Sequence, residues 1–163
     1  MQELIFNAQS YHNLQYHRHS HKNSEIMIVT AGCIQVETSD ETVAIASGQG
    51  IFIPPYYIHS YESTEDSSCY IWEFSSTLIP EKICDNLVLF EFPFEHDGHI
   101  FNISHMDNIY AKKSAIYRIA SIISSDPKTL YVNDSHSICS RTIQFIVDNF
   151  DKPITLRSVY VIR

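Results

Sequence analysis

The stretch HSHKNSEIMIVTAG, residues 19–32, decides the fold of this chain. Its two histidines, His19 and His21, lie two residues apart on an extended segment, so their side chains point the same way. Glu25 follows four residues later, where an apolar strand begins, and its carboxylate can turn back toward them. Imidazole and carboxylate groups in this arrangement predict a site that either ligates a divalent metal or hydrogen-bonds a polar small molecule.

A second stretch, GQGIFIPPYYIH, residues 48–59, complements the first. Its glycines predict a turn, its apolar centre a short buried strand, and its prolines a bend that ends on another polar group, His59. The spacing of the two stretches resembles the two sequence motifs of the cupin family. The matching residues are His19, His21, Glu25 and Gly32 in the first motif and Gly48, Pro54 and His59 in the second.

The cupin resemblance implies a mainly β fold, a double-stranded β-helix barrel of jelly-roll type with both motifs facing its interior. Two positions depart from the second motif. Tyr56 stands where cupins usually have glycine, and Ser63 where they usually have asparagine. Many short β-rich segments separated by turn signals independently favour an antiparallel barrel or sandwich.

Composition and charge argue against several classes of protein. The 163 residues are 44% hydrophobic and 12% aromatic, which is enough for a folded core. The formal net charge is −8, with 11 Lys and Arg and no basic cluster, which argues against this chain gripping a nucleic acid on its own. Signal-peptide features and an apolar run of membrane-spanning length are both missing, so we expect a cytoplasmic protein without membrane contact.

The character of the sequence changes after the barrel. We expect residues 1–106 to form the barrel with a short N-terminal arm, residues 107–150 an antiparallel helical hairpin, and residues 151–163 the start of a further unit. The second helix of the hairpin is expected from about Ser135 to Phe150. The first helix carries an apolar stripe at helical spacing. Such a helix pair either packs on the barrel or offers a face to a second subunit, and we predict that the stripe mediates dimerisation. The residues of this stripe are Ile109, Ile116, Ile119 and Ile123.

Two further segments make the resemblance more specific. YIWEFS, residues 70–75, resembles the aromatic strand that follows the second cupin motif in AraC-type transcription regulators. IQFIVDNFDKPITL, residues 143–156, resembles the entry to the DNA-binding half of that family. The resemblance implies the N-terminal effector-binding and dimerisation half of such a regulator, acting as a homodimer. We expect the chain to be truncated before the C-terminal half, through which alone DNA would be contacted.

The expected ligand-binding residues are the polar groups of the two motifs and two aromatic residues. They are His19, His21, Glu25, His59, Tyr61 and Trp72. Core packing is the alternative role for the two aromatic side chains. Of these, His19, His21, Glu25 and His59 are also the expected ligands if a divalent transition metal (Ni, Zn, Fe or Mn) is bound.

The predicted function is the sensing of a small polar effector, which is a sugar, a urea-like solute or a metal ion. The alternative is a metal-dependent cupin enzyme, either a dioxygenase or an isomerase. The helices after the barrel and the tail that resembles a DNA-binding entry favour the sensor, because a minimal enzyme requires neither. No catalytic residue is assigned, since no nucleophile with an adjacent base is evident outside the expected metal site.

Overall fold

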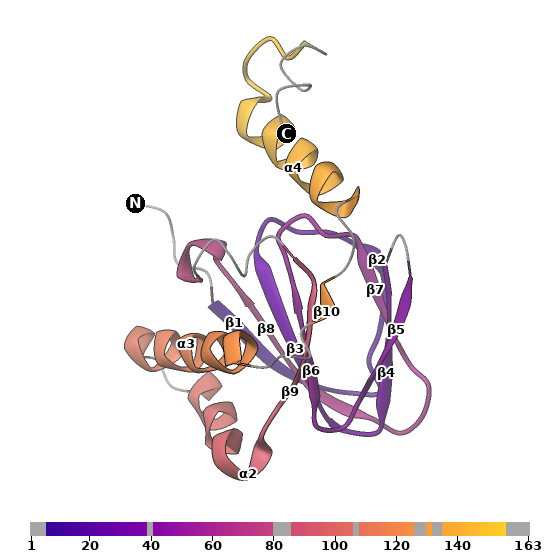
Figure 1. Cartoon of the computed structure of the whole chain (residues 1–163), viewed down its shortest axis with the longest axis vertical. Coiled ribbons are helices and arrows are strands. Elements are labelled where there is room, and N and C mark those ends of the chain that lie inside the picture. Colours follow the sequence, from indigo (N-terminus) through magenta and orange to yellow (C-terminus); the bar gives the residue numbers. More distant parts are fainter. Residues whose placement is uncertain are drawn as a thin grey trace.

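The computed structural model describes residues 6–38, 41–79, 86–105, 108–125, 130–131 and 135–155. These residues form two antiparallel sheets that face each other as a barrel (Figure 1). In sheet A the strand order is β1 (Phe6–His12), β8 (Ser68–Phe74), β3 (Ser24–Ala31), β6 (Gln49–Ile53), β9 (Val88–Glu91) and β10 (Leu130–Tyr131). In sheet B it is β2 (Gln15–His19), β7 (His59–Ser63), β4 (Cys33–Thr38) and β5 (Thr42–Ala46). The predicted mainly β barrel is confirmed.

The predicted N-terminal arm is a strand over its described part. β1 pairs with β8 along its whole length, from Phe6 opposite Phe74 to His12 opposite Ser68. Residues 1–5 of the predicted arm lie outside the described residues, as do residues 156–163 of the predicted further unit. β1 is therefore an edge strand of sheet A and forms part of the barrel wall.

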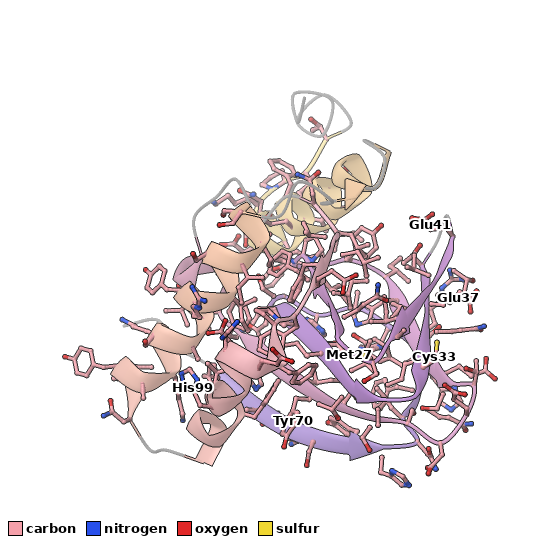
Figure 2. All side chains as sticks on the ribbon, turned by 60° about the horizontal axis from the view of Figure 1, so that its bottom comes forward. Met27, Cys33, Glu37, Glu41, Tyr70 and His99 are labelled. Atoms are coloured by element: carbon pink, nitrogen blue, oxygen red, sulfur yellow. The ribbon has the colours of Figure 1, made fainter. Side chains whose placement is uncertain are left out.

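Sheet A is apolar on both faces because each face packs against a different layer. Along β3, Met27 and Val29 face sheet B, whereas Ile26 and Ile28 face the helices. Met27 and Tyr70, both labelled in Figure 2, mark the two faces: Met27 lies in the core between the sheets and Tyr70 packs against the core under the helices. Burial on both faces explains why the strand sequence is continuously hydrophobic rather than alternating.

Three helical elements follow β9 and cover the outer face of sheet A. They are α2 (Phe94–Asp97), the 3-10 helix η2 (Gly98–His105) and α3 (Ile109–Ser125). A second 3-10 helix, η1 (Ser76–Leu78), follows β8. Arg118 of α3 forms hydrogen bonds of 2.8 Å and 2.9 Å with the two carboxylate oxygens of Asp97. This ion pair holds the pKa of Asp97 below its usual range and joins α2 to α3.

The isoleucine stripe of α3 is part of the core, so its prediction as a dimerisation surface is wrong. Ile116, Ile119 and Ile123 are at most 4% exposed and pack with the aromatic side chains on the outer face of sheet A. Ile109 is half-buried. The helical period identified the apolar stripe correctly. The stripe is covered by sheet A of the same chain rather than by a second chain.

The second predicted helix is present as α4 (Ser135–Asn149), but the two helices do not form a hairpin. β10 lies between them in the chain and pairs with β9. Figure 1 shows α3 against sheet A and α4 apart from it, beyond one end of the barrel. The reason is that the apolar stripe of α3 is already satisfied by the sheet. Among the described residues, no helix is long and apolar enough to cross a membrane.

Two glycines with positive φ offer a matched test of the corners of the barrel. Gly32 (φ +68°) and Gly48 (φ +91°) both adopt a conformation that costs other residues about 1–2 kcal/mol. A Cβ on Gly32 would meet the carbonyl oxygen of Asp66, whereas one on Gly48 would meet nothing within 4 Å. Gly48→Ala is therefore expected to lower the free energy of unfolding by about 1–2 kcal/mol. Gly32→Ala, which adds overpacking, is expected to lower it by about 2–5 kcal/mol. Urea denaturation measures both, and equal losses would contradict the steric argument.

Candidate functional site

Four polar side chains of the two motifs converge inside the barrel. His19 ends β2, His21 lies between β2 and β3, Glu25 is in β3 and His59 begins β7. Pairing of β2 with β7 places His19 directly opposite His59. One ligand atom from each of the four residues lies within 4.8 Å of the ligand atoms of the other three. The predicted convergence of these residues in one interior is confirmed. We call them the His/Glu cluster.

The backbone fixes the orientation of all three imidazole rings. In each ring, Nδ1 lies 2.8 Å from a backbone carbonyl oxygen: that of His17 for His19, of Asn23 for His21 and of Tyr57 for His59. A carbonyl oxygen only accepts hydrogen bonds, so each Nδ1 carries a proton. The three Nε2 atoms are thereby left for the cluster. Metal-binding histidines are characteristically held in this way, with the second ring nitrogen bonded to a carbonyl or carboxylate.

His21 and Glu25 form an ion pair at the centre of the cluster. His21 Nε2 lies 3.1 Å from Glu25 Oε2. Burial alone would lower the pKa of His21, but the hydrogen bond and the charge of Glu25 outweigh it and raise that pKa. Burial alone would raise the pKa of Glu25, but hydrogen bonds from His21 and Tyr61 and the proximity of His59 lower it. The hydrogen bond and the charge interaction between the two groups therefore favour a protonated His21 beside an ionised Glu25.

His59 has an unused nitrogen deep in the protein. Its side chain is fully buried, and Nε2 has no hydrogen-bond partner among the described residues. The closest carboxylate oxygen, Glu25 Oε1, is 3.9 Å away. Burial lowers the pKa of His59 to about 4, so the ring is neutral at neutral pH and Nε2 presents a lone pair. Leaving a buried acceptor unsatisfied costs about 1–3 kcal/mol, which a ligand at this position would recover.

The two predicted aromatic residues lie on opposite faces of the barrel wall. Tyr61, from β7, is buried and donates its hydroxyl hydrogen to Glu25 Oε1. Burial and the charge of Glu25 raise its pKa well above the usual range, so it remains a donor. Trp72 is on the outer face of sheet A, buried with Phe6 and Phe101 against the helices. Its prediction as a ligand-binding residue is wrong.

The bend that precedes His59 is tied to the first motif and to α4. Tyr56, which replaces the glycine usual in cupins, has a φ of +60°. Its backbone N–H donates to the carbonyl oxygen of His21 over 2.7 Å. Burial and the negative charge of Asp148 in α4 raise the pKa of the Tyr56 side chain. This residue therefore contacts the segment that carries His21 and lies within electrostatic range of α4.

A cavity of about 350 Å³ adjoins the cluster between the two sheets. The wall from sheet A consists of Asn7, Gln9 and Tyr11 of β1, Glu25 of β3, and Ile71 and Glu73 of β8. The wall from sheet B consists of Tyr16 and His19 of β2 and Tyr61 of β7, and Leu14 and His21 lie just outside these strands. The polar residues from β1 and β8 escaped prediction from the sequence. The sequence feature that could have identified Glu73 is the alternation of side chains along β8. Alternation places Glu73 on the same face as Ile71 and on the opposite face from Trp72.

The fold and the cavity define a class of protein, a β-barrel domain that binds a ligand between its sheets. The sequence specifies which one: residues 3–100 match the AraC-like ligand binding domain, and the chain belongs to this family. Comparison with curated protein sequences gives no match.

Solved structures of ToxT support the same fold. ToxT from Vibrio cholerae matches with a TM-score of 0.60 at 10% identity, over 94% of this chain and 69% of that one. ToxT with a bound unsaturated fatty acid matches with a TM-score of 0.59 at 8% identity, over 98% and 68% of the two chains. A cupin-2 domain protein from Shewanella frigidimarina has 23% identity over 45% of this chain and 72% of its own, with a TM-score of 0.39.

Proposed function

We propose that this chain is the effector-sensing part of a transcription regulator and that a divalent transition metal in the His/Glu cluster is the effector or part of it. The family match supports an effector-binding domain. One observation carries the choice of a metal. Three imidazoles with their Nδ1 atoms bonded to backbone carbonyls direct Nε2 toward one carboxylate, and the Nε2 of His59 has no partner among the described residues.

The donor set fits the proposed metal. Neutral imidazole and carboxylate ligands suit Zn, Ni, Fe and Mn, and no cysteine belongs to the cluster. His19, His21, Glu25 and His59 would hold the ion, which would supply a positive charge beside the carboxylate of Glu25. Tyr61 would hold the carboxylate of Glu25 in place through its hydroxyl. A polar molecule bound by the same side chains without a metal is the second candidate, supported by the adjoining cavity.

The further parts of the proposal concern partners. Transcriptional control requires contact with DNA, and we assign that contact to a separate DNA-binding half of the regulator. A homodimer remains part of the proposal, but the stripe of α3 is not its interface because it is buried within one chain. An enzyme remains the alternative, and turnover assays become informative only after metal binding has been demonstrated.

A titration with metal ions tests the proposal. Protein stripped with a chelator is expected to bind one Co²⁺ or Zn²⁺ per chain, and Co²⁺ binding is followed by its visible absorption. A hundredfold excess of the ion over its dissociation constant should stabilise the fold by about 2.7 kcal/mol. Mg²⁺ is the control, because it prefers oxygen ligands and should give no stabilisation. Absence of stoichiometric Co²⁺, Zn²⁺, Ni²⁺ and Mn²⁺ binding would contradict the metal and favour the metal-free candidate.

A further inference from the structure

The cavity beside the His/Glu cluster carries a second carboxylate that the cluster does not use. Glu73 of β8 is the direct cross-strand partner of Glu25 in β3 and of Asn7 in β1. Residues opposite each other in an antiparallel pair project from the same face with their Cβ atoms about 5 Å apart. Both carboxylates line the cavity. Like charges placed directly opposite each other are destabilising unless something compensates them.

Compensation is unequal for the two carboxylates. Glu25 has the Nε2 of His21 at 3.1 Å and the hydroxyl of Tyr61 as a second donor. Glu73 is half-buried, and the hydrogen bond that the structure gives it comes from a neutral amide, Asn23 Nδ2, at 2.6 Å. No lysine or arginine among the described residues lines this cavity. Glu73 is therefore a carboxylate without a Lys or Arg partner among the described residues, and His21, which lies within its electrostatic range, is hydrogen-bonded to Glu25 instead.

The neighbouring side chains on β1 and β2 add hydrogen-bond acceptors and aromatic rings. The hydroxyl of Tyr11 donates to Gln9 Oε1 at 2.5 Å, and Gln9 Nε2 donates to Asn7 Oδ1 at 3.4 Å. The donor of Tyr11 is thus used within the wall, and its oxygen lone pairs remain able to accept. The ring of Tyr16, which is 57% exposed, also lines the cavity. A carboxylate beside tyrosine rings and acceptor oxygens is the environment that stabilises an organic cation.

We propose that the organic ligand of this cavity is a small cation, bearing an ammonium or guanidinium group that pairs with Glu73. The proposal rests on the proposed function, because it names the chemical class of effector for the same domain. At about 350 Å³ the cavity falls within the size range of small-molecule sites. The uncharged end of such a molecule reaches the His/Glu cluster through His19 and His21, which line the cavity. Carboxylates are disfavoured, in contrast to the fatty acid bound by ToxT.

A charge-matched ligand panel tests the proposal. The panel consists of monoamines, diamines and guanidines of two to eight carbons, each with its alcohol and carboxylate counterpart, together with oleate. Thermal shift identifies binders, and calorimetry at fixed ionic strength measures their dissociation constants. Amines or guanidines are expected to bind better than their counterparts, and Glu73→Gln should weaken that binding about tenfold or more. The preference is measured on both metal-free and metal-loaded protein.

Glu62→Gln is the matched control, because the whole chain carries a net charge of −8 and attracts cations in general. Glu62 is an exposed carboxylate on β7, and its removal changes the net charge by the same amount without altering the cavity. Binding should be unchanged in this variant. Tighter binding of carboxylates or alcohols, equal effects of the two substitutions, or no shift with any amine or guanidine would overturn the proposal.

The proposal of a bound metal and the proposal of a bound organic cation can be rejected independently of each other. Glu73 is not a member of the His/Glu cluster, so Glu73→Gln should keep the Co²⁺ affinity of the unmodified protein, which also verifies its fold. If the unmodified protein binds no metal but binds amines in a Glu73-dependent way, the metal proposal is rejected and the cation proposal stands. If the protein binds metal but binds no amine, only the cation proposal is rejected.

Discussion

Replacing Glu25 with glutamine is expected to weaken Co²⁺ or Zn²⁺ binding by more than about 100-fold. Loss of a residue that merely supports a metal ligand typically costs 10–100-fold in affinity, and Glu25 is the one carboxylate of the His/Glu cluster. Glutamine has nearly the same shape and keeps an oxygen that accepts from Tyr61. It cannot supply the negative charge that balances the ion.

Calorimetric titration of the metal-free variant measures this effect, with Glu62→Gln as the control for loss of one negative charge. Circular dichroism and thermal unfolding should show that the Glu25→Gln variant is folded. Glu25 is only 5% exposed, so an unfolded variant is a real outcome. In that case His19→Ala, at a less buried residue, provides the second measurement. A folded variant with unchanged metal affinity would show that Glu25 is a structural acid, paired with His21 and Tyr61 for the stability of the barrel.

The second large effect is expected in α3, where Ile116→Ala should lower the free energy of unfolding by about 2–5 kcal/mol. Ile116 is fully buried, and truncation of a core isoleucine loses both its transfer free energy and the packing around the space that it leaves. Tyr117→Ala is the control on the next residue. Its side chain is 54% exposed, and its removal should change stability by no more than about 0.5 kcal/mol.

Urea denaturation gives both values, and sizing in solution accompanies it. If the isoleucine stripe is core, Ile116→Ala reduces stability and leaves the solution mass of the folded protein unchanged. If the variant has unchanged stability but an altered solution mass, the stripe is the dimerisation surface predicted from the sequence. The experiment therefore decides between the two roles that an apolar helical stripe can have.

The sequence was sufficient for the cluster because its residues lie on strands whose geometry is local. Alternation along the first motif places His19 and His21 on one side, and the pairing of β2 with β7 brings His59 opposite His19. The spacing of the second motif provided the corner that makes this pairing possible. Local rules of this kind also predicted the helical stripe that contains Ile116.

The same rules could not tell which layer covers each face. Alternation in β8 separates Trp72 from Glu73, but it does not say which of them faces the cavity. Both faces of sheet A are buried, so hydrophobicity did not distinguish them and the aromatic face was chosen wrongly. The α3 stripe was misassigned for the same reason, since its partner is the sheet face that contains Trp72. Long-range packing, which no single segment encodes, determined both outcomes.

The left-handed conformation of Tyr56 has a consequence for signal transmission. A tyrosine held at this φ costs of order 1–3 kcal/mol, a penalty that a glycine would avoid. Unlike a glycine, Tyr56 has a side chain, and this side chain lies within electrostatic range of Asp148 in α4. The backbone of the same residue is hydrogen-bonded to His21. If the domain senses a ligand as proposed, displacement of His21 would act on the backbone of Tyr56 through this hydrogen bond, and the side chain of Tyr56 lies within electrostatic range of α4.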